Sequence, residues 1–551
     1  MIIYKYHPAM KTPLKVIISL MGLLAMVGGA CFAQSDTRPN ILLIVADDLG
    51  YVDITCFGGD IETPNIDALA ANGIRFSRFH TAPLCSPTRA MLMSGNDNHI
   101  AGVGQQSLFT NHFGYEGRIT DRVATVPEVL RDAGYHTYMA GKWHLGWGPE
   151  SHPYHRGFEH VFTGEKGATY FYGDQCFEDP SGQILYTENG KPVKWKDGDY
   201  STDLHTDKLI SYIDRHKDDG KPFFAYAAYT SPHWPLQVDE AHWRKFEGRY
   251  DEGYDVRRKK NLNRLKKMGM IPQNAGLSAL SQNHRPWDSL TPAEQKHQAR
   301  KMEVYAGLVD NLDYNIGRLI QYLKAIGEYK NTVILFMSDN GPAAGDRFNM
   351  PAHRERLMKD FNDDYDRMGK PDSWIAYGLG WAESGASPFR STKGDTTEGG
   401  TLANMIMTGP GIVSDNQINH SFTTLMDVAP TFYEIAQTRY PKTYNGKPVY
   451  SLRGSSLMPV ASGQASTVHD QDYVYAQETG ERALVRKGHW KLLNSIRPFS
   501  RDNFELYDLS TDLAEKHNLK DKQPDKYLEL LAEWDRFAEE IRVQFPSPQQ
   551  M

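Results

Sequence analysis

The 551-residue chain is predicted to be an α/β protein with a large, mostly parallel sheet sandwiched between helices. A smaller C-terminal α+β domain with an antiparallel sheet is expected to follow. Three observations predict this: apolar runs alternate with segments of helical periodicity, polar residues follow several runs directly, and the runs become short near the C-terminus. Because the chain is too long for a single hydrophobic core, we expect a large domain over residues 36–440 and a small domain over 441–551.

The first expected strand, residues 40–46, is a continuous apolar run, which is typical of a strand covered on both faces. Asp47 and Asp48 follow it at once. A helix is expected over 64–72, and an alternating strand over 74–81 then leads into the loop that contains Cys85.

This helix–strand unit repeats three more times along the chain. The expected helices are 125–134, 203–216 and 293–326, and the strands that follow them are 135–140, 222–230 and 332–337. Lys142 and His144 follow the first of these strands, the proline-bracketed His233 the second, and Asp339 and Asn340 the third. Because parallel sheets collect ligands at the carboxyl ends of their strands, we expect these side chains to meet.

The main domain is expected to end with a helix over 430–436, after which the strand signals shorten. The expected short strands are 473–477, 483–486, 490–493 and 504–507, followed by a final helix over 525–543. The stretch 250–288 has the look of an inserted surface segment, and we interpret its charge runs, 257–260 and 266–267, as solvated helix faces.

The N-terminus carries the features of a secretory signal. Lys11 and Lys15 precede an apolar run over 16–27, and small residues then lead to a cleavage site after Ala33. Residues 1–33 are therefore interpreted as a signal peptide of a periplasmic or secreted protein. The run is shorter than the roughly 20 residues of a spanning helix, so no stable membrane span is expected. Cys31 follows a loose lipoprotein-like box, which leaves a lipid anchor as an alternative.

The net charge of the chain argues against a nucleic-acid partner, and the cysteine count does not decide which cysteines pair. The formal net charge of -7 gives no basic surplus, so nucleic acid is not expected as a partner. Without the signal, Cys56, Cys85 and Cys176 remain, an odd number for an oxidising compartment. If Cys85 is modified, Cys56 and Cys176 could pair or stay free, and their spacing does not decide between these outcomes.

Two pairs of oxygen-bearing residues predict a metal site. Asp47 and Asp48 follow one buried strand, and Asp339 and Asn340 follow another. Each pair alone is more often a turn or a helix cap. Together they offer carboxylate and amide oxygens, which suit Ca²⁺, with Mg²⁺ as the alternative, whereas zinc sites favour histidine and cysteine.

The run Cys85-Ser86-Pro87-Thr88-Arg89 and the helix-like stretch after it resemble the signature of the type I sulfatases, members of the alkaline phosphatase superfamily. In that family a maturation enzyme oxidises the cysteine to formylglycine. Residues 44–50, 141–146 and 336–341 resemble sulfatase blocks in the same order, and 98–102 and 426–430 are similar to bacterial arylsulfatases such as the Pseudomonas enzyme. Two-zinc phosphatases of the superfamily typically have histidine where Asn340 stands.

The resemblance implies a role for each candidate residue. The aldehyde made from Cys85 would hydrate to a diol, of which one hydroxyl attacks sulfur and the other expels sulfate. The implied catalytic residues are Cys85, Arg89, Lys142, His144, His233, Asp339 and Lys393, and the implied metal ligands are Asp47, Asp48, Cys85, Asp339 and Asn340. Arg89 would bond the diol, Lys142 and Lys393 would bind sulfate, and Asp339 would ionise the attacking hydroxyl. His144 would accept the proton of the second hydroxyl, and His233 would bind and protonate the leaving group.

The expected activity is therefore that of an arylsulfatase-like sulfuric ester hydrolase acting on a small-molecule or glycan sulfate ester. One alternative is a phosphonate or phosphate monoester hydrolase with the same nucleophile. Another is a non-catalytic protein that binds sulfated glycans while Cys85 stays unconverted. Aromatic residues at 169–172 and 374–381 are compatible with stacking on aryl or sugar groups, although such residues more often pack. A monomer is the default expectation.

Overall fold

The computed structural model describes Met1 and residues 37–106, 110–164, 170–173, 186–346 and 350–545. The predicted signal peptide, with Cys31, lies outside these residues, and so does Cys176. Among the described residues, no helix combines the length and the apolar character needed to span a bilayer.

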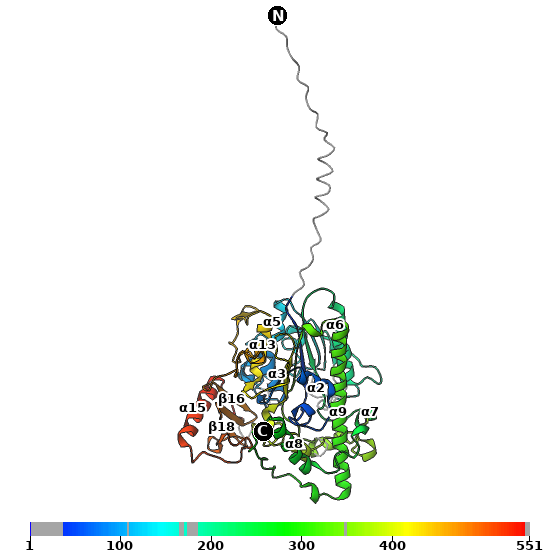
Figure 1. The fold of residues 1–551 in the computed structure, drawn as a ribbon, viewed down its shortest axis with the longest axis vertical. Helices are drawn as coiled ribbons and strands as arrows, with labels where there is room; N and C mark the ends of the chain where they lie inside the picture. The colour runs from blue at the N-terminus through cyan, green and yellow to red at the C-terminus, as the bar shows by residue number, and fades with distance from the viewer. Residues whose placement is uncertain (2–36, 107–109, 165–169, 174–185, 347–349, 546–551) are drawn as a thin grey trace.

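A ten-stranded sheet forms the centre of the molecule (Figure 1). Its order is β12-β2-β11-β9-β1-β8-β4-β5-β6-β7. The strands are β12 (Gln417–Asn419), β2 (Gly73–Phe76), β11 (Met405–Thr408), β9 (Thr332–Ser338), β1 (Asn40–Ala46), β8 (Phe223–Ala228), β4 (His136–Lys142), β5 (His160–Gly164), β6 (Tyr186–Glu188) and β7 (Lys191–Val193). The five central strands, β9 to β5, pair in parallel, and β11, β6 and β7 pair antiparallel to their neighbours. The predicted mostly parallel α/β sheet is confirmed.

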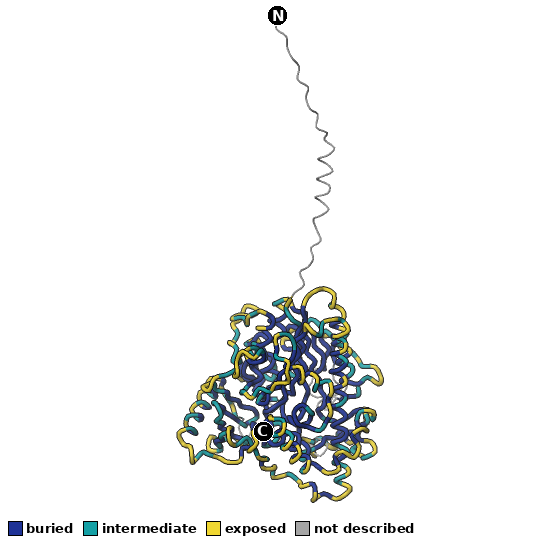
Figure 2. The backbone as a smooth tube through the Cα atoms, in the orientation of Figure 1, coloured by how far each residue is buried: buried dark blue, intermediate teal, exposed yellow. Residues whose placement is uncertain are grey.

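Both faces of the sheet are buried, as the continuous apolar run of β1 predicted (Figure 2). Ile41, Leu43 and Val45 pack into one hydrophobic core, and the alternate residues 42, 44 and 46 pack into the other. The first core is covered by α3 (Cys85–Ser94), α4 (Asn98–Ala101), α5 (Val126–Asp132) and α13 (Val428–Ile435). The second is covered by α2 (Pro64–Ala71), α6 (Ser201–His216), α7 (Glu240–Trp243), α8 (Tyr254–Met268), α9 (Pro292–Ala325) and α11 (Leu379–Gly385).

The helix boundaries follow from local sequence signals. Thr125 caps α5 and Thr291 caps α9, each through a capping box with the glutamate three residues later, and each helix has proline in its first turn. The 34-residue α9 is buried along one face and exposed along the other, which agrees with its amphipathic pattern.

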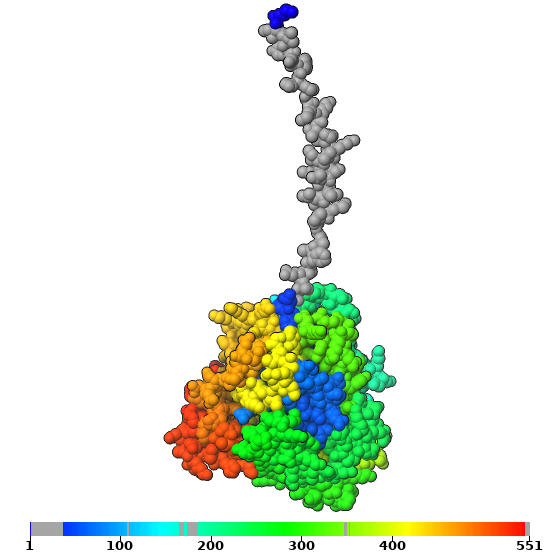
Figure 3. Space-filling view, in the orientation of Figure 1, coloured from blue at the N-terminus to red at the C-terminus, as the bar shows by residue number. Residues whose placement is uncertain are grey.

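The C-terminal residues form a separate antiparallel sheet beside the main domain, a lobe that Figure 3 shows in orange and red. Its strands are β16 (Val474–Thr479), β17 (Arg482–Lys487), β18 (Trp490–Asn494) and β19 (Glu505–Asp508), and α15 (Pro524–Glu540) packs on it. Buried polar contacts join it to the main domain. Lys491 Nζ lies 2.7 Å from Glu398 Oε1, and His99 Nε2 lies 3.0 Å from Glu478 Oε2. The remaining short elements are β10 (Leu402–Ala403), β14 (Thr443–Tyr444), β15 (Lys447–Pro448), α10 (Pro351–Leu357), α12 (Glu398–Thr401) and α14 (Met458–Ala461).

The single strand expected over 74–81 is wrong. The chain bends at Ser77 and Arg78, so β2 belongs to the large sheet, while β3 (Phe79–His80) joins β10 and β13 (Thr423–Thr424) in a three-stranded sheet. Residues before the bend pair with strands of the large sheet, and residues after it pair with strands of the small sheet. The alternation of polar and apolar residues does not show where a strand leaves one sheet for another.

The interpretation of 257–260 as a solvated charge run is also partly wrong. Arg257 is 4% exposed and donates hydrogen bonds to Asp60 Oδ1 at 2.8 Å and Asp53 Oδ1 at 3.1 Å. Arg258 is buried as well and donates to the carbonyl of Ser278 at 2.6 Å. Lys259 and Lys260, which complete this run, are exposed. Two of the four cations are therefore buried: Arg257 is paired with carboxylates far away in the sequence, and Arg258 is hydrogen-bonded to Ser278.

Candidate active site

The predicted site residues meet at the carboxyl ends of the central strands. Asp47 and Asp48 follow β1, Asp339 and Asn340 follow β9, and Lys142 ends β4. Since β1 pairs with β9 and β8, and β8 pairs with β4, these strand ends are neighbours. The strand topology therefore assembles the cluster that the sequence pattern predicted.

Cys85 is the first residue of α3 and is almost completely buried, with 1% of its surface exposed. Its Sγ lies 3.4 Å from Asp47 Oδ1 and 3.8 Å from Asp48 Oδ1, and Lys393 Nζ donates to it at 3.0 Å. Burial, together with the Asp339 carboxylate, raises the pKa of the thiol well above its usual value. Because the thiolate is the reactive form, the unmodified thiol is a poor nucleophile here.

The acidic cluster has the donor set of a cation site. Ligand atoms of Asp47, Asp48, Cys85 and Asp339 all lie within 4.8 Å of one another. Asp48 Oδ2 and Asn340 Oδ1 are buried and have no hydrogen-bond partner within the described structure. Buried oxygens without a partner are costly, and a cation that binds them would remove this cost. Carboxylate and amide oxygens fit a hard cation such as Ca²⁺.

Two lysines balance the carboxylates. Lys142 Nζ donates to Asp47 Oδ2 at 2.7 Å, and Lys393 Nζ donates to Asp48 Oδ1 at 2.6 Å. Burial alone would raise the pKa of both carboxyl groups, but Lys142 beside Asp47, Lys393 beside Asp48, and His233 near both hold their pKa values below the usual range. Both carboxylates therefore remain charged and available to a cation.

Arg89 links two residues of this cluster, Asp339 and Lys142, through hydrogen bonds. Its guanidinium is 0% exposed and donates to Asp339 Oδ2 from Nε at 3.2 Å and from Nη2 at 2.9 Å. Nη1 donates to the carbonyl of Lys142 at 2.8 Å and to the hydroxyl of Tyr226 at 3.1 Å. Sequence reasoning missed Tyr226, because a tyrosine inside the apolar β8 carries no signal that distinguishes it from a core residue.

His233 adjoins the cluster at Asp48 and is 8% exposed. Its Nδ1 donates to the carbonyl of Trp234 at 2.5 Å, which leaves Nε2 facing Asp48 Oδ2 at 3.4 Å. The hydrogen bond to a carbonyl fixes which ring nitrogen carries the proton when the ring is neutral.

His144 differs from the other candidates, because its ring makes no hydrogen bond within the described structure and its Nδ1 is buried. Burial, and then the positive charge of Lys142, holds the pKa of His144 well below its usual value, so the ring is neutral and able to accept a proton. His144 and Asp48 both have positive φ, 59° and 66°. Such conformations are uncommon outside glycine and are frequent at functional sites.

The aromatic side chains of the segment 374–381 are buried. Trp374 and Trp381 are both 0% exposed, and Tyr170 packs edge-to-face on Trp374 with ring centroids 5.9 Å apart. Tyr170 and Trp374 belong to a small hydrophobic cluster, and Trp381 belongs to the second core of the sheet. Thr169 lies outside the described residues.

Comparison with known proteins agrees with this site. Residues 39–438 match the Sulfatase family model, and residues 398–543 match the model described as N-sulphoglucosamine sulphohydrolase, C-terminal. An uncharacterized sulfatase of Schizosaccharomyces pombe is 40% identical over 524 residues, covering 92% of this chain and 94% of its own. An arylsulfatase of Klebsiella aerogenes is 38% identical over 445 residues, covering 79% of this chain and 94% of its own.

Among solved structures, Ps i-CgsB in complex with k-i-k-neocarrahexaose superimposes with a TM-score of 0.65 at 25% identity, covering 91% of this chain and 93% of that one. The buried cluster of carboxylates, lysines and histidines at the strand ends defines a hydrolase of anionic esters. The chain belongs to the sulfatase family and is a sulfuric ester hydrolase. The predicted family and fold are confirmed.

Proposed function

We propose that this enzyme hydrolyses sulfate monoesters in the manner of an arylsulfatase, with formylglycine made from Cys85 and a bound Ca²⁺. The observation that carries the proposal is the position of Cys85 Sγ, between two carboxylates and the Lys393 ammonium at the start of a buried helix. A thiol whose pKa is raised by burial does not explain such a setting. A modified side chain that reacts as an oxygen nucleophile does.

The residues that would hold the cation are Asp47, Asp48, Asp339 and Asn340, together with the modified Cys85. The hydrated aldehyde supplies one hydroxyl to attack sulfur and another to expel sulfate, and Ca²⁺ supplies the charge that favours the ionised hydroxyl. Mg²⁺ is the weaker candidate, because it requires near-octahedral geometry and retains several waters.

The remaining side chains bind the substrate and move protons. Lys142 and Lys393 bind sulfate oxygens and offset the charge that develops on them. His233, in its form protonated on both ring nitrogens, presents Nε2–H to the leaving oxygen and donates that proton there. His144, neutral because of its lowered pKa, accepts the proton of the second hydroxyl. Arg89 positions Asp339, which serves as the base for the attacking hydroxyl.

The substrate class is a sulfate ester of an aryl compound or a glycan. Two relatives support this range: the arylsulfatase of Klebsiella aerogenes and an N-acetylglucosamine-6-O-sulfatase of Bacteroides thetaiotaomicron, 25% identical and covering 93% of this chain and 88% of its own. We also propose that residues 1–33 direct export, so that the mature enzyme is periplasmic or secreted, which fractionation and N-terminal sequencing would test.

The function is tested by intact-mass analysis combined with turnover. Conversion of the Cys85 thiol to an aldehyde lowers the mass by about 18 Da, a value set by covalent chemistry. Purified enzyme should show this loss and hydrolyse 4-nitrophenyl sulfate much faster than 4-nitrophenyl phosphate, and Cys85→Ala should show neither the mass loss nor the activity. Full turnover by protein of unconverted mass would refute the formylglycine proposal, and a preference for the phosphate would refute the substrate class.

A further inference from the structure

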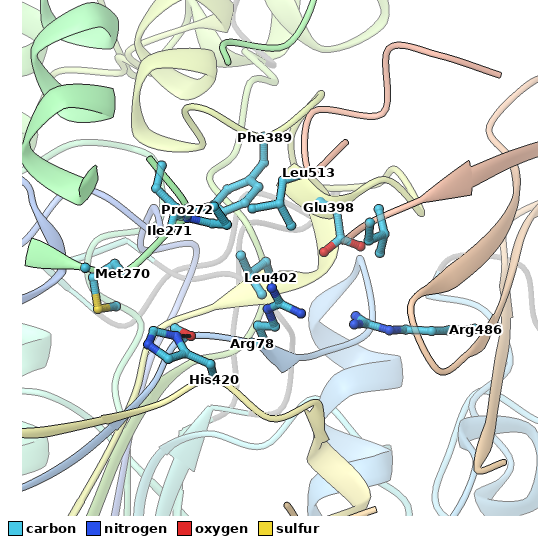
Figure 4. A pocket seen from close by; sticks show the side chains of 13 residues that line it. Arg78, Met270, Ile271, Pro272, Phe389, Glu398, Leu402, His420, Arg486 and Leu513 are labelled. Atoms are coloured by element: carbon cyan, nitrogen blue, oxygen red, sulfur yellow. Dashed lines mark hydrogen bonds between the residues drawn. The ribbon is translucent and has the colours of Figure 1, made fainter. Parts of the chain in front are cut away.

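A cavity lies at the seam between the main domain and the C-terminal sheet, and it shares no residue with the catalytic cluster. Its volume is about 230 Å³. One wall is apolar and is formed by Met270, Ile271, Phe389, Leu402, Leu509 and Leu513 (Figure 4). Arg78, which follows β2, and Arg486, which lies on β17, line it from the two domains. Figure 4 shows their guanidinium groups pointing toward one another.

Within the described structure neither guanidinium makes a direct hydrogen bond or ion pair with a carboxylate, although the charges of Glu398 and Glu515 act on Arg486 and partly offset the repulsion from Arg78. Among the residues that the structure describes, the side chain of Arg78 has no hydrogen-bond or ion-pair partner. Arg486 is 4% exposed, and its guanidinium donates only to the carbonyl of Gly488, at 3.2 Å, and lies 3.3 Å from His80 Nε2. Two buried or half-buried guanidinium groups that face one another repel, unless an anion lies between them.

The nearest acidic side chain in the lining is already occupied. Glu398 Oε1 accepts from Lys491 at 2.7 Å, and Glu398 Oε2 lies 3.0 Å from His80 Nε2. Both oxygens of this carboxylate therefore face other partners, so the cavity keeps an excess of positive charge on its polar side.

The size and the opening of the cavity restrict the ligand. An engineered apolar cavity of about 150 Å³ holds benzene, so the larger space here admits one ring with a small charged substituent. Gly269, Pro272 and His420 at its edge are exposed, which leaves the cavity open to solvent. A lining that combines two guanidinium groups with apolar side chains suits a molecule that has an anionic group and an apolar part.

We propose that this cavity binds a small organic anion, whose carboxylate or sulfonate group bridges Arg78 and Arg486 and whose ring or short chain packs on the apolar wall. The ligand neutralises the two guanidinium groups and joins the two domains, because each domain contributes one of them. The site is separate from the catalytic centre and does not depend on the modification of Cys85.

Isothermal titration with benzoate tests this proposal on the intact mature protein. Wild-type protein should bind benzoate saturably, and benzyl alcohol, which has the ring without the charge, should bind at least about tenfold more weakly. Arg78→Gln should weaken benzoate binding by about tenfold, since it removes one charged donor. Leu513→Trp should fill the cavity and remove binding.

Two controls make the result specific. Arg439→Gln removes an exposed arginine that does not line the cavity and should leave the affinity for benzoate unchanged. Because an aryl anion can also enter the catalytic centre, each titration is repeated with Lys393→Ala, in which the Arg78-dependent binding should persist. Absence of saturable binding to folded wild-type protein would overturn the proposal, and so would equal affinity in Arg78→Gln. Arg78 has no partner to lose, so this variant remains informative if Leu513→Trp does not fold.

Discussion

Replacement of Lys393 by methionine should lower kcat/KM for sulfate ester hydrolysis by about 10²–10³, the loss that follows removal of one preorganised donor at a developing charge. Methionine keeps the length of the side chain and removes the ammonium. That ammonium lies 2.6 Å from Asp48 Oδ1 and 3.0 Å from Cys85 Sγ, so it adjoins the side chain that the proposed function makes the nucleophile. Burial would lower the pKa of Lys393, but Asp48 and Cys85 hold it well above its usual value, so the wild-type side chain is charged throughout the assay range.

The magnitude follows from the free energy of that donor. A single such donor contributes about 2.7–4 kcal/mol to the transition state. At about 1.36 kcal/mol for each factor of ten, this corresponds to two to three orders of magnitude. If the ammonium acts mainly in the transition state, kcat and kcat/KM should fall together.

The assay measures initial rates with 4-nitrophenyl sulfate at saturating Ca²⁺, corrected for the fraction of converted Cys85 by intact mass. Lys393→Arg keeps the charge but changes its shape and should recover part of the rate. Lys330→Met, at an exposed lysine, should match the wild type. A folded Lys393→Met enzyme with a rate within about threefold of the wild type would refute a contact between this ammonium and the sulfate.

Three further outcomes are expected. A chelator should abolish hydrolysis and added Ca²⁺ should restore it, because Asp48 Oδ2 and Asn340 Oδ1 are buried without a hydrogen-bond partner in the described structure and a cation would satisfy them. An unchanged rate would show that hydrolysis does not require the metal. His233→Ala should slow alkyl sulfates more than 4-nitrophenyl sulfate, since poor leaving groups need the proton more, and an equal loss for both would contradict the role as acid. Burial lowers the pKa of His99, but its two carboxylate partners raise it to about 9. This interaction stabilises the fold fully below the unfolded pKa of about 6.5, and about 3 kcal/mol is lost as the pH rises through 9. Urea unfolding at both ends of this pH range should show that loss of unfolding free energy in the wild type and not in His99→Gln. The same pH dependence of the unfolding free energy in both proteins would contradict this role of His99.

The positions of the strand-end residues could be predicted because the apolar runs before them are long and unambiguous. Asp47 and Asp339 each end such a run, and parallel topology then brings them together although nearly three hundred residues separate them. Lys393 had no such strand before it, and its predicted place near the sulfate depended on resemblance alone. The structure places its Nζ beside Cys85 Sγ, through a loop in which the backbone N–H of Gly394 donates to the carbonyl of Pro83 at 2.8 Å.

The failures have a common physical cause, which is that the partner lies far away in the sequence. The charge run on α8 looked like a solvated face, but Asp53 and Asp60 make burial of Arg257 favourable. The hydroxyl of Tyr226 accepts a hydrogen bond from Arg89, although the sequence of β8 indicates only an apolar strand. The charge run does not contain the carboxylates that bind Arg257, and the apolar run of β8 does not contain the arginine that binds Tyr226. Local periodicity therefore could not identify either contact.

The burial of Cys85 restricts when another enzyme can reach its thiol. With 1% of its surface exposed and α3 packed over the sheet, the thiol cannot enter the active site of another protein once folding is complete. Any enzyme that oxidises Cys85 must therefore meet the chain while α3 is still undocked. Under the formylglycine proposal, the time available for oxidation is the interval between synthesis and folding, so faster folding would yield more protein with an unreacted thiol.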